Sequence, residues 1–139
     1  MKGRVTGIGG IFFKSNDTEK SKNWYYDKLG LTPNDHGSVF EFRHGADPQS
    51  KGYALWSPFD KNTDYFEPSK AEFMINFRVE NLEDLVVHLK NSGVTICDEI
   101  EEYDYGKFVH ILDPDGNKIE LWEPIDSSFT KEYEGRTTM

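Results

Sequence analysis

The sequence contains very little cysteine. Cys97 is the single cysteine among 139 residues, which excludes an intramolecular disulfide and a metal site built from several thiolates. It ends the segment Val94–Cys97, which has the β-branched composition of a strand. We therefore expect a buried, unreactive thiol at this position.

Basic residues are also scarce. The chain has 16 Lys and Arg against 25 Asp and Glu, which gives a formal net charge of -9 and a pI of about 4.9. Phosphate recognition needs clustered basic residues, and here they are interleaved with acids, so we expect no nucleic-acid partner. An acidic surface keeps a protein soluble, and it leaves open a preference for cationic ligands.

Long hydrophobic runs are missing as well. The apolar run before Lys14 is too short for a signal peptide or a membrane-spanning helix, so we expect a cytoplasmic protein without a membrane partner. Aromatic residues, by contrast, are abundant, with 10 Phe, 7 Tyr and 3 Trp. This composition and length predict a single domain over residues 1–139 with an interior lined by aromatic rings.

The first half of the chain carries the signals of a strand, a helix and further strands. Gly7–Lys14 is rich in β-forming residues. Asn16 and Glu19 fit a capping box at the start of a helix, and Gly30 is placed to end that helix. Two more strands are predicted over residues 38–44 and 53–59.

The second half repeats this order. Phe73–Glu80 has the composition of a strand, and Asn81 is the expected cap of a helix that Gly93 ends. The apolar face of this helix follows the spacing i, i+3, i+4, i+7 and consists of Leu82, Leu85, Val86 and Leu89. Three more strands are predicted over residues 94–97, 107–112 and 118–123.

The two halves match in detail. GYALWSP aligns with KIELWEP at an offset of 66 residues, and IFFKSND aligns with INFRVEN at an offset of 64. The sequence therefore predicts an α+β fold made of two tandem β-α-β-β-β modules. The modules cover about residues 5–58 and 72–124, with a linker at 59–71 and a polar, loosely held tail at 125–139.

This pattern resembles the vicinal oxygen chelate superfamily, which contains glyoxalase I, extradiol dioxygenases and the bleomycin-resistance proteins. The resemblance rests on the repeat, on NDTEKSKNWYYDKLGL after the first strand, and on YGKFVHILDPDGNKIELWEP at the end of the second module. It implies a U-shaped, barrel-like mixed sheet around one cleft that holds a small molecule, and it implies a homodimer.

The resemblance also locates the positions of metal ligands. Metalloenzymes of the superfamily take two ligands from each module, and these positions read Gly10, Ala54, Met74 and Glu120 here. Only Glu120 suits a divalent cation, and such a site needs about three protein ligands. We therefore expect no metal, no other cofactor, and neither metal-dependent glyoxalase nor dioxygenase activity. A different metal site that combines His110 with Glu120 stays open.

Glu120 is a charged residue in an otherwise apolar strand. Its direct neighbours suit the face of the strand that packs on a helix, so Glu120 is expected to face the cleft. With a three-residue loop at the DPDGN turn, His110 lies opposite Glu120 and Phe108 lies opposite Trp122.

His110 and Glu120 are then the candidate catalytic residues, as a general base and the group that orients it. Two other readings stay open. The pair could only satisfy each other's hydrogen bonds, or Glu120 could pair with Arg78 or Lys118.

The other positions expected to face the cleft predict ligand contacts. They combine aromatic rings with a few polar groups, as small-molecule sites do. The expected ligand-binding residues are Phe12, Trp56, Met74, Asn76, Arg78, Phe108 and Trp122. Three tyrosines outside the predicted strand centres are candidates to cover the pocket, namely Tyr65, Tyr103 and Tyr105.

Two functions follow from these features. The first is a protein that binds a small aromatic or cationic molecule without a bound metal, as in the bleomycin-resistance branch. The second is a glyoxalase-like lyase or isomerase in which Glu120, with His110, moves a proton next to a carbonyl group. The missing metal ligands and the acidic, aromatic composition favour the first, and the retained Glu120 favours the second. We favour the binding protein.

Overall fold

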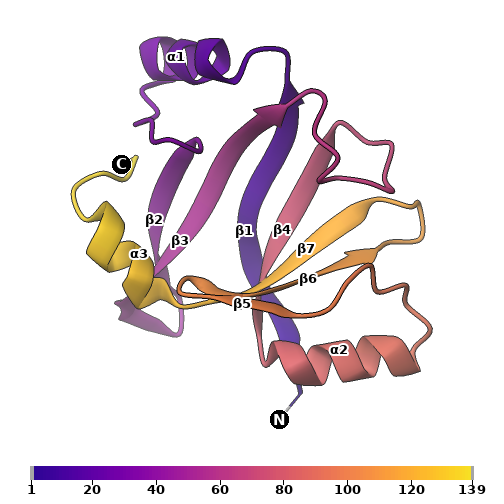
Figure 1. Ribbon diagram of the computed structural model, residues 1–139. Coiled ribbons are helices and arrows are strands. Elements are labelled where there is room, and N and C mark those ends of the chain that lie inside the picture. Colours follow the sequence, from indigo (N-terminus) through magenta and orange to yellow (C-terminus); the bar gives the residue numbers. More distant parts are fainter. Residues whose placement is uncertain (1, 139) are drawn as a thin grey trace.

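The computed structural model describes residues 2–138 and shows an α+β fold (Figure 1). The first half of the chain forms β1 (Arg4–Ser15), α1 (Thr18–Leu29), β2 (Ser38–His44) and β3 (Asp47–Asp60). The second half forms β4 (Phe73–Glu80), α2 (Leu82–Asn91), β5 (Glu101–Tyr103), β6 (Gly106–Leu112) and β7 (Lys118–Pro124), and α3 (Asp126–Tyr133) follows. The predicted fold class is confirmed, and so is the order of elements up to residue 124, apart from the strand predicted over residues 94–97.

Within residues 2–138, the strands β1 to β7 belong to one open seven-stranded sheet with the order β2-β3-β1-β4-β7-β6-β5. The β1–β3 and β4–β7 pairs are parallel and the others are antiparallel, so the sheet is mixed. The two halves meet at the antiparallel pair β1–β4, where Gly10 faces Asn76 and Phe12 faces Met74. The offset of 64 residues relates Gly10 to Met74 and Phe12 to Asn76. The pairing therefore places matching residues symmetrically, so an approximate two-fold axis relates the halves.

The outer face of the sheet carries α1 and α2, at opposite ends (Figure 1). Leu82, Leu85 and Val86 of α2 are buried in one cluster with residues of the adjoining strands, namely Val79, Val109, Ile111 and Leu121. At the other end, the Tyr25 ring of α1 lies 4.3 Å from that of Trp56. The inner face of the sheet is left to line a cavity.

The cap residue of α1 differs from the predicted one, whereas that of α2 is the predicted residue but caps the helix without its side chain. Asp17, not Asn16, is the N-cap of α1, and its Oδ1 accepts a 3.0 Å hydrogen bond from the amide of Lys20. Asn81 is the N-cap of α2, but it is left-handed (φ 54°) and its side chain makes no cap bond. Instead Oε1 of Glu123 accepts from the amide of Leu82 at 2.6 Å. The predicted left-handed end of α1 at Gly30 is confirmed.

The strand predicted over residues 94–97 is wrong, since only Ile96 forms a bridge there, to Ile111 of β6. Asp98, two residues after Ile96, explains why the strand pairing stops there. The carboxylate of Asp98 accepts a 2.8 Å hydrogen bond from the amide of His110, so a side chain takes the place of a backbone partner. Cys97 is only half-buried, although burial still raises the pKa of its thiol and so keeps it less reactive.

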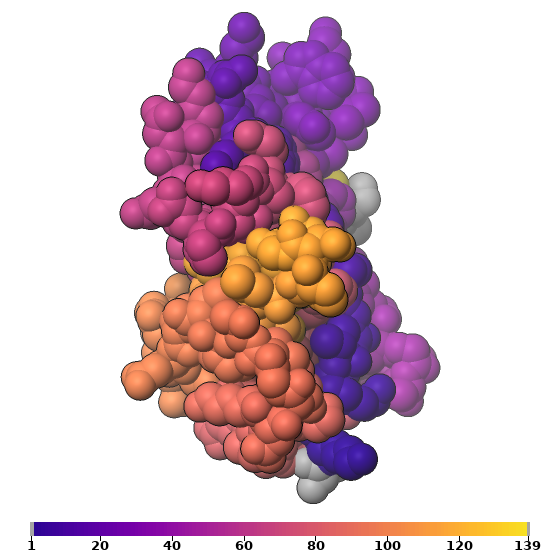
Figure 2. Space-filling view, turned by 90° about the vertical axis from the view of Figure 1, so that its right-hand side faces the viewer, coloured from indigo at the N-terminus to yellow at the C-terminus, as the bar shows by residue number. Residues whose placement is uncertain are grey.

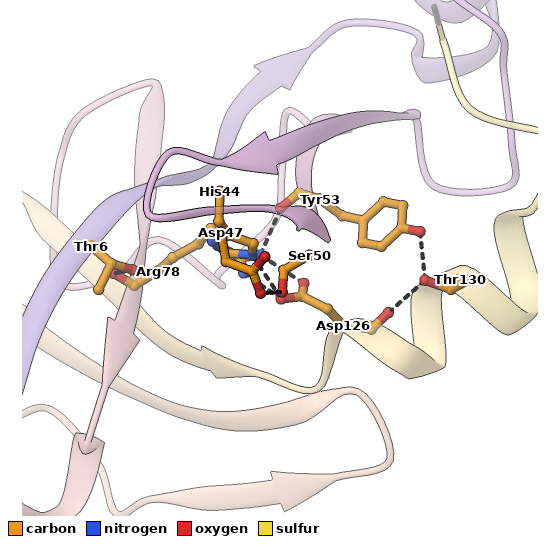
Figure 3. Close-up of polar contacts among 8 residues, drawn as sticks. All are labelled: Thr6, His44, Asp47, Ser50, Tyr53, Arg78, Asp126 and Thr130. Atoms are coloured by element: carbon orange, nitrogen blue, oxygen red, sulfur yellow. Dashed lines mark hydrogen bonds and ion pairs between the residues drawn. The ribbon is translucent and has the colours of Figure 1, made fainter.

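The tail is not loosely held, because residues 126–133 form α3 across the inner side of the sheet (Figure 1). Phe129 of α3 is buried against Tyr53 and Trp122. Arg78 of β4 binds both carboxylate oxygens of Asp126, at 3.0 and 2.6 Å (Figure 3). Polar composition concealed this helix, because only Phe129 and Tyr133 make its apolar contacts, which is too few to define a helical period.

The segment that joins the modules packs against the sheet as well. Phe66 is fully buried in a cluster with Phe12 and Met74. Lys118, at the start of β7, donates a 2.6 Å hydrogen bond to the carbonyl of Tyr65. Figure 2 shows this segment, in magenta, lying next to the turn between β6 and β7, in orange. Across residues 2–138, no helix has both the length and the apolar character that membrane spanning requires.

Candidate functional site

A cavity of about 910 Å³ opens on the inner face of the sheet. Phe12 of β1, Leu55 and Ser57 of β3, and residues of β6 and β7 form its floor. Phe129 of α3 lines one side, and Tyr65 of the joining segment lines another. The cavity is therefore bounded by elements from both modules and by the two segments that follow them.

Glu120 lies in the wall of this cavity and is only 3% exposed. Its Oε1 accepts a 2.7 Å hydrogen bond from Nδ2 of Asn76, which lies beside it on β4. Its Oε2 accepts from Nε2 of His110 at 2.8 Å and from the hydroxyl of Tyr65 at 2.5 Å. The predicted register, with His110 opposite Glu120, is confirmed. Both carboxylate oxygens are thus already engaged.

His110 links Glu120 to a second carboxylate. Its Nδ1 lies 2.6 Å from Oδ2 of Asp98, so each ring nitrogen faces a carboxylate oxygen. A neutral imidazole would present a lone pair to one of them, whereas the imidazolium donates to both. Burial alone would lower the pKa of His110, but the hydrogen bonds and charges of Glu120 and Asp98 outweigh it and raise the pKa above its usual value.

Tyr65 completes a chain of hydrogen bonds that runs from Asp98 through His110 and Glu120. Burial raises the pKa of Tyr65, and the charge and hydrogen bond of Glu120 raise it further. The side chain therefore stays a phenol that donates its proton to Glu120. Its ring stacks on Phe59 at 5.6 Å and meets the His110 ring edge-on at 5.3 Å.

The structure brings most of the predicted site residues to the cavity. The predicted residues that line it are Phe12, Phe108, His110, Glu120 and Trp122, and the expected covering tyrosines Tyr65, Tyr103 and Tyr105 line it too. Asn76 is fully buried and supports Glu120 from behind. Met74 is equally buried, beneath Phe66.

Two predicted ligand contacts lie elsewhere. Arg78 is held by Asp126, and its guanidinium packs over the Trp122 ring at 5.6 Å. Trp56 points to the outer face, where it packs on Phe13 and Tyr25. The proposed pairing of Glu120 with Arg78 or Lys118 is also wrong, because Arg78 binds Asp126 and Lys118 binds a backbone carbonyl.

The strand register explains the error at Trp56. Phe12 lies beside Ser57 in the parallel pair of the first module, as Asn76 lies beside Glu120 in the second. Ser57 is therefore the counterpart of Glu120, and not Ala54 as the offset of 66 residues indicated. Ala54 and Ser57 are separated by an odd number of residues, so they lie on opposite faces of the strand. Trp56, which shares the face of Ala54, therefore points away from the cavity.

The sequence reasoning missed Asp98 entirely and gave Tyr65 no polar role. Both residues lie outside the strands, where alternation gives no direction for a side chain. The only available signal for Tyr65 was its place among aromatic and acidic residues in the joining segment.

The cavity carries an excess of unpaired acidic groups. Several carboxylates that line it form no ion pair within residues 2–138, namely those of Asp35, Asp60, Glu101, Asp104 and Glu132. The two lysines that line it are already engaged. Lys22 donates to the carbonyls of Asn34 and Asp35, and Lys118 donates to that of Tyr65.

The residues present do not fit the metal of the superfamily. Gly10 and Ala54 offer no donor atom, Met74 is enclosed by Phe12 and Phe66, and Glu120 is engaged by three donors. Among the described residues, no group of three or more His, Cys, Asp or Glu side chains is arranged to hold a metal ion. Asp98, His110 and Glu120 hold each other instead.

The comparisons with known proteins agree with this architecture. Residues 8–126 match the model of the glyoxalase-like domain family, so the chain belongs to that family. No curated protein matches the chain in sequence. The fold is shared with a glyoxalase/bleomycin resistance protein/dioxygenase superfamily member from Vibrio splendidus 12B01, at 12% identity and a TM-score of 0.53, over 86% of this chain and 99% of that chain.

Two further structures share the fold and have described ligands. Streptomyces coelicolor methylmalonyl-CoA epimerase in complex with 2-nitronate-propionyl-CoA has 16% identity and a TM-score of 0.60, over 87% of this chain and 99% of that chain. The Mn(II)-bound glyoxalase from Novosphingobium aromaticivorans has 18% identity and a TM-score of 0.57, over 87% of this chain and 40% of that chain. Proteins of this fold thus include binders of small molecules.

Proposed function

We propose that this protein binds a small organic cation with an aromatic part, without using a metal. The observation that carries the proposal is the set of unpaired carboxylates around an aromatic cavity, beside lysines that are already engaged. A positive ligand would supply the charge that the cavity lacks, because unlike charges attract more strongly in a partly desolvated site.

The aromatic walls support the same ligand class. Tyr103 and Tyr105 stack at 5.3 Å, and Phe108 and Trp122 stack at 5.8 Å. Aromatic faces attract cations and also pack against planar rings. Tyr103 and Tyr105 remain 45% and 44% exposed, so these rings offer free surface to a ligand.

The state of Glu120 supports binding over catalysis. A general base needs a free lone pair within reach of the proton that it removes. Glu120 already accepts three hydrogen bonds, which occupy three of its roughly four lone-pair sites, and each ring nitrogen of His110 faces a carboxylate oxygen. The chain from Asp98 to Tyr65 therefore serves as a fixed polar wall of the binding site.

Isothermal titration calorimetry with three matched probes tests this proposal. We expect benzylammonium and benzyltrimethylammonium to bind, and phenylacetate to bind at least about tenfold more weakly. Raising the salt concentration should weaken both cations, since part of the attraction is screened. Tyr105→Ala should weaken both cations as well, because it removes an exposed ring of the cavity. Equal or tighter binding of phenylacetate would contradict the proposal.

A second function, a lyase or isomerase that moves a proton next to a carbonyl, is favoured by one observation. Asp98 holds His110 in a fixed orientation against Glu120, which is the arrangement of an oriented acid and base. Similar structures include methylmalonyl-CoA epimerases, but the phosphates of a CoA ester would meet acidic groups at this cavity. Incubation with methylmalonyl-CoA in deuterated water tests this function. Deuterium at the α-carbon that disappears in Glu120→Gln would support it.

A further inference from the structure

The cavity has one end at which tyrosines and carboxylates gather. We call it the acidic end, formed by Tyr65, Asp98, Glu101, Tyr103 and Glu120. The charges of Glu120, Asp98 and Glu101 all act on the hydroxyl of Tyr65. Two basic groups are bonded to this set among the described residues, His110 to Asp98 and Glu120, and Lys118 to the backbone carbonyl of Tyr65, and together they offset at most two of the three negative charges. A net negative charge therefore remains there.

The direction of the hydrogen bonds at the acidic end is fixed. A carboxylate only accepts, so the hydroxyl of Tyr65 must donate to Glu120, and that of Tyr103 must donate to Glu101. Each hydroxyl therefore has no further proton to donate to a ligand. The phenol oxygens keep free lone pairs, and so do Asp98 and Glu101. This end thus offers acceptors and no free hydroxyl donor to a ligand.

We infer that the acidic end selects cations that carry N–H groups, such as protonated amines, amidinium and guanidinium groups, with Tyr65 as the specificity-determining residue. This inference rests on the proposed function and narrows its ligand class. A quaternary ammonium carries the same charge and suits aromatic faces equally well. It has no N–H, however, so it would cover the acceptors without bonding them, which is costly in a buried site.

Tyr65 is placed to make this distinction. It is 37% exposed and lines the cavity, while its hydroxyl is tied to the wall through Glu120. Its ring is fixed by stacking on Phe59, and its backbone carbonyl accepts from Lys118. The oxygen is therefore held in one place, so that an N–H donor can bond it without ordering a mobile side chain.

The test compares benzylammonium with benzyltrimethylammonium, which differ only in N–H against N–CH3. By calorimetry with the wild-type protein, we expect benzylammonium to bind about tenfold more tightly, the worth of roughly one hydrogen bond to a charged group. Tyr65→Phe keeps the ring and removes the oxygen, so it should weaken benzylammonium alone. Tyr26→Phe is the matched control, because Tyr26 is 56% exposed on α1 and its ring lies outside the cavity.

A second variant separates charge from hydrogen bonding. Glu101→Gln removes one negative charge from an exposed position and should weaken both cations by a similar factor. Equal affinity of the two cations for the wild-type protein would overturn this inference and leave the proposed function standing. An unchanged preference in Tyr65→Phe would exclude Tyr65 as its source. If neither cation binds, the proposed function and the inference both fail.

Discussion

Helices α1 and α2 occupy corresponding places in the two halves of the chain, but different contacts hold them. Leu82, Leu85 and Val86 of α2 are buried in the largest apolar cluster of the outer face. In α1 the one buried residue is Lys22, whose ammonium donates to carbonyls of the segment that follows the helix. Apolar packing therefore holds α2 to the sheet, while α1 helps to shape the mouth of the cavity.

On the inner face of the sheet, the second half is the more polar of the two halves. Asn76 and Glu120 of the second half are polar, and they are joined by His110. Their counterparts in the first half are Phe12 and Ser57. One module thus supplies the charged wall of the cavity and the other supplies its apolar wall. The two β-α-β-β-β halves therefore form a site with two chemically distinct sides.

The largest expected effect tests the contrast between the two helices. Leu82→Ala removes a fully buried side chain from the α2 cluster and should lower the free energy of unfolding by about 3 kcal/mol. Leu29→Ala on α1 is the matched control, since Leu29 is 60% exposed, and its effect should stay within about 0.5 kcal/mol. Urea denaturation of both variants measures the difference. Similar losses would show that α1 is held as firmly as α2.

The next effect tests how closely the two halves meet on the inner face. A Cβ atom added at Gly9 would lie 2.1 Å from Oδ1 of Asn76 and 3.0 Å from the Trp122 ring. Gly9→Ala should therefore displace the amide that supports Glu120 and cost about 2 kcal/mol of stability. Gly7→Ala, in the same strand, meets no atom within 4 Å and serves as the control. Comparable stability of the two variants would contradict this contact.

A smaller effect follows from the charged wall of the second half. Because the folded-state pKa of His110 is raised, its contribution to stability is complete below the usual histidine pKa of about 6.5 and is lost as the pH rises through the raised value. The free energy of unfolding should therefore fall over this range. His110→Gln should be less stable at low pH and should lack this fall.

Thermal denaturation from pH 6 to pH 9 measures the pH dependence, with His88→Gln on the exposed side of α2 as the control. NMR titration of the imidazole identifies the group responsible. A His110 resonance that titrates at or below the ordinary value would remove the two-carboxylate explanation.

The order of elements could be predicted from the sequence, because the signals that define it are local. Strand alternation and the DPDGN turn together placed His110 opposite Glu120, and the structure confirms that register. Helical spacing located the buried face of α2. Helix α3 could not be found in this way, because it depends on a distant partner. Arg78 of β4 and Asp126 are 48 residues apart in the chain.

The site could be predicted only where strands carry it. Alternation correctly turned Glu120 inward. It placed Trp56 on the wrong face, because the offset between matching residues is even for β1 and β4 but odd for β3 and β7. Asp98 and Tyr65 reach Glu120 and His110 from irregular segments. Their directions depend on tertiary contacts, which no periodicity in the sequence records.

The smallest effect compares the caps of the two helices. Asp17 caps α1 with its own side chain, so Asp17→Ala should cost about 1 kcal/mol in urea denaturation. Asn81 holds only a left-handed backbone at the start of α2, where Glu123 of β7 accepts the first amide instead. Glycine adopts that backbone freely, so Asn81→Gly should change stability by less than about 0.5 kcal/mol. A large loss in Asn81→Gly would mean that its side chain, and not the strand β7, starts the helix.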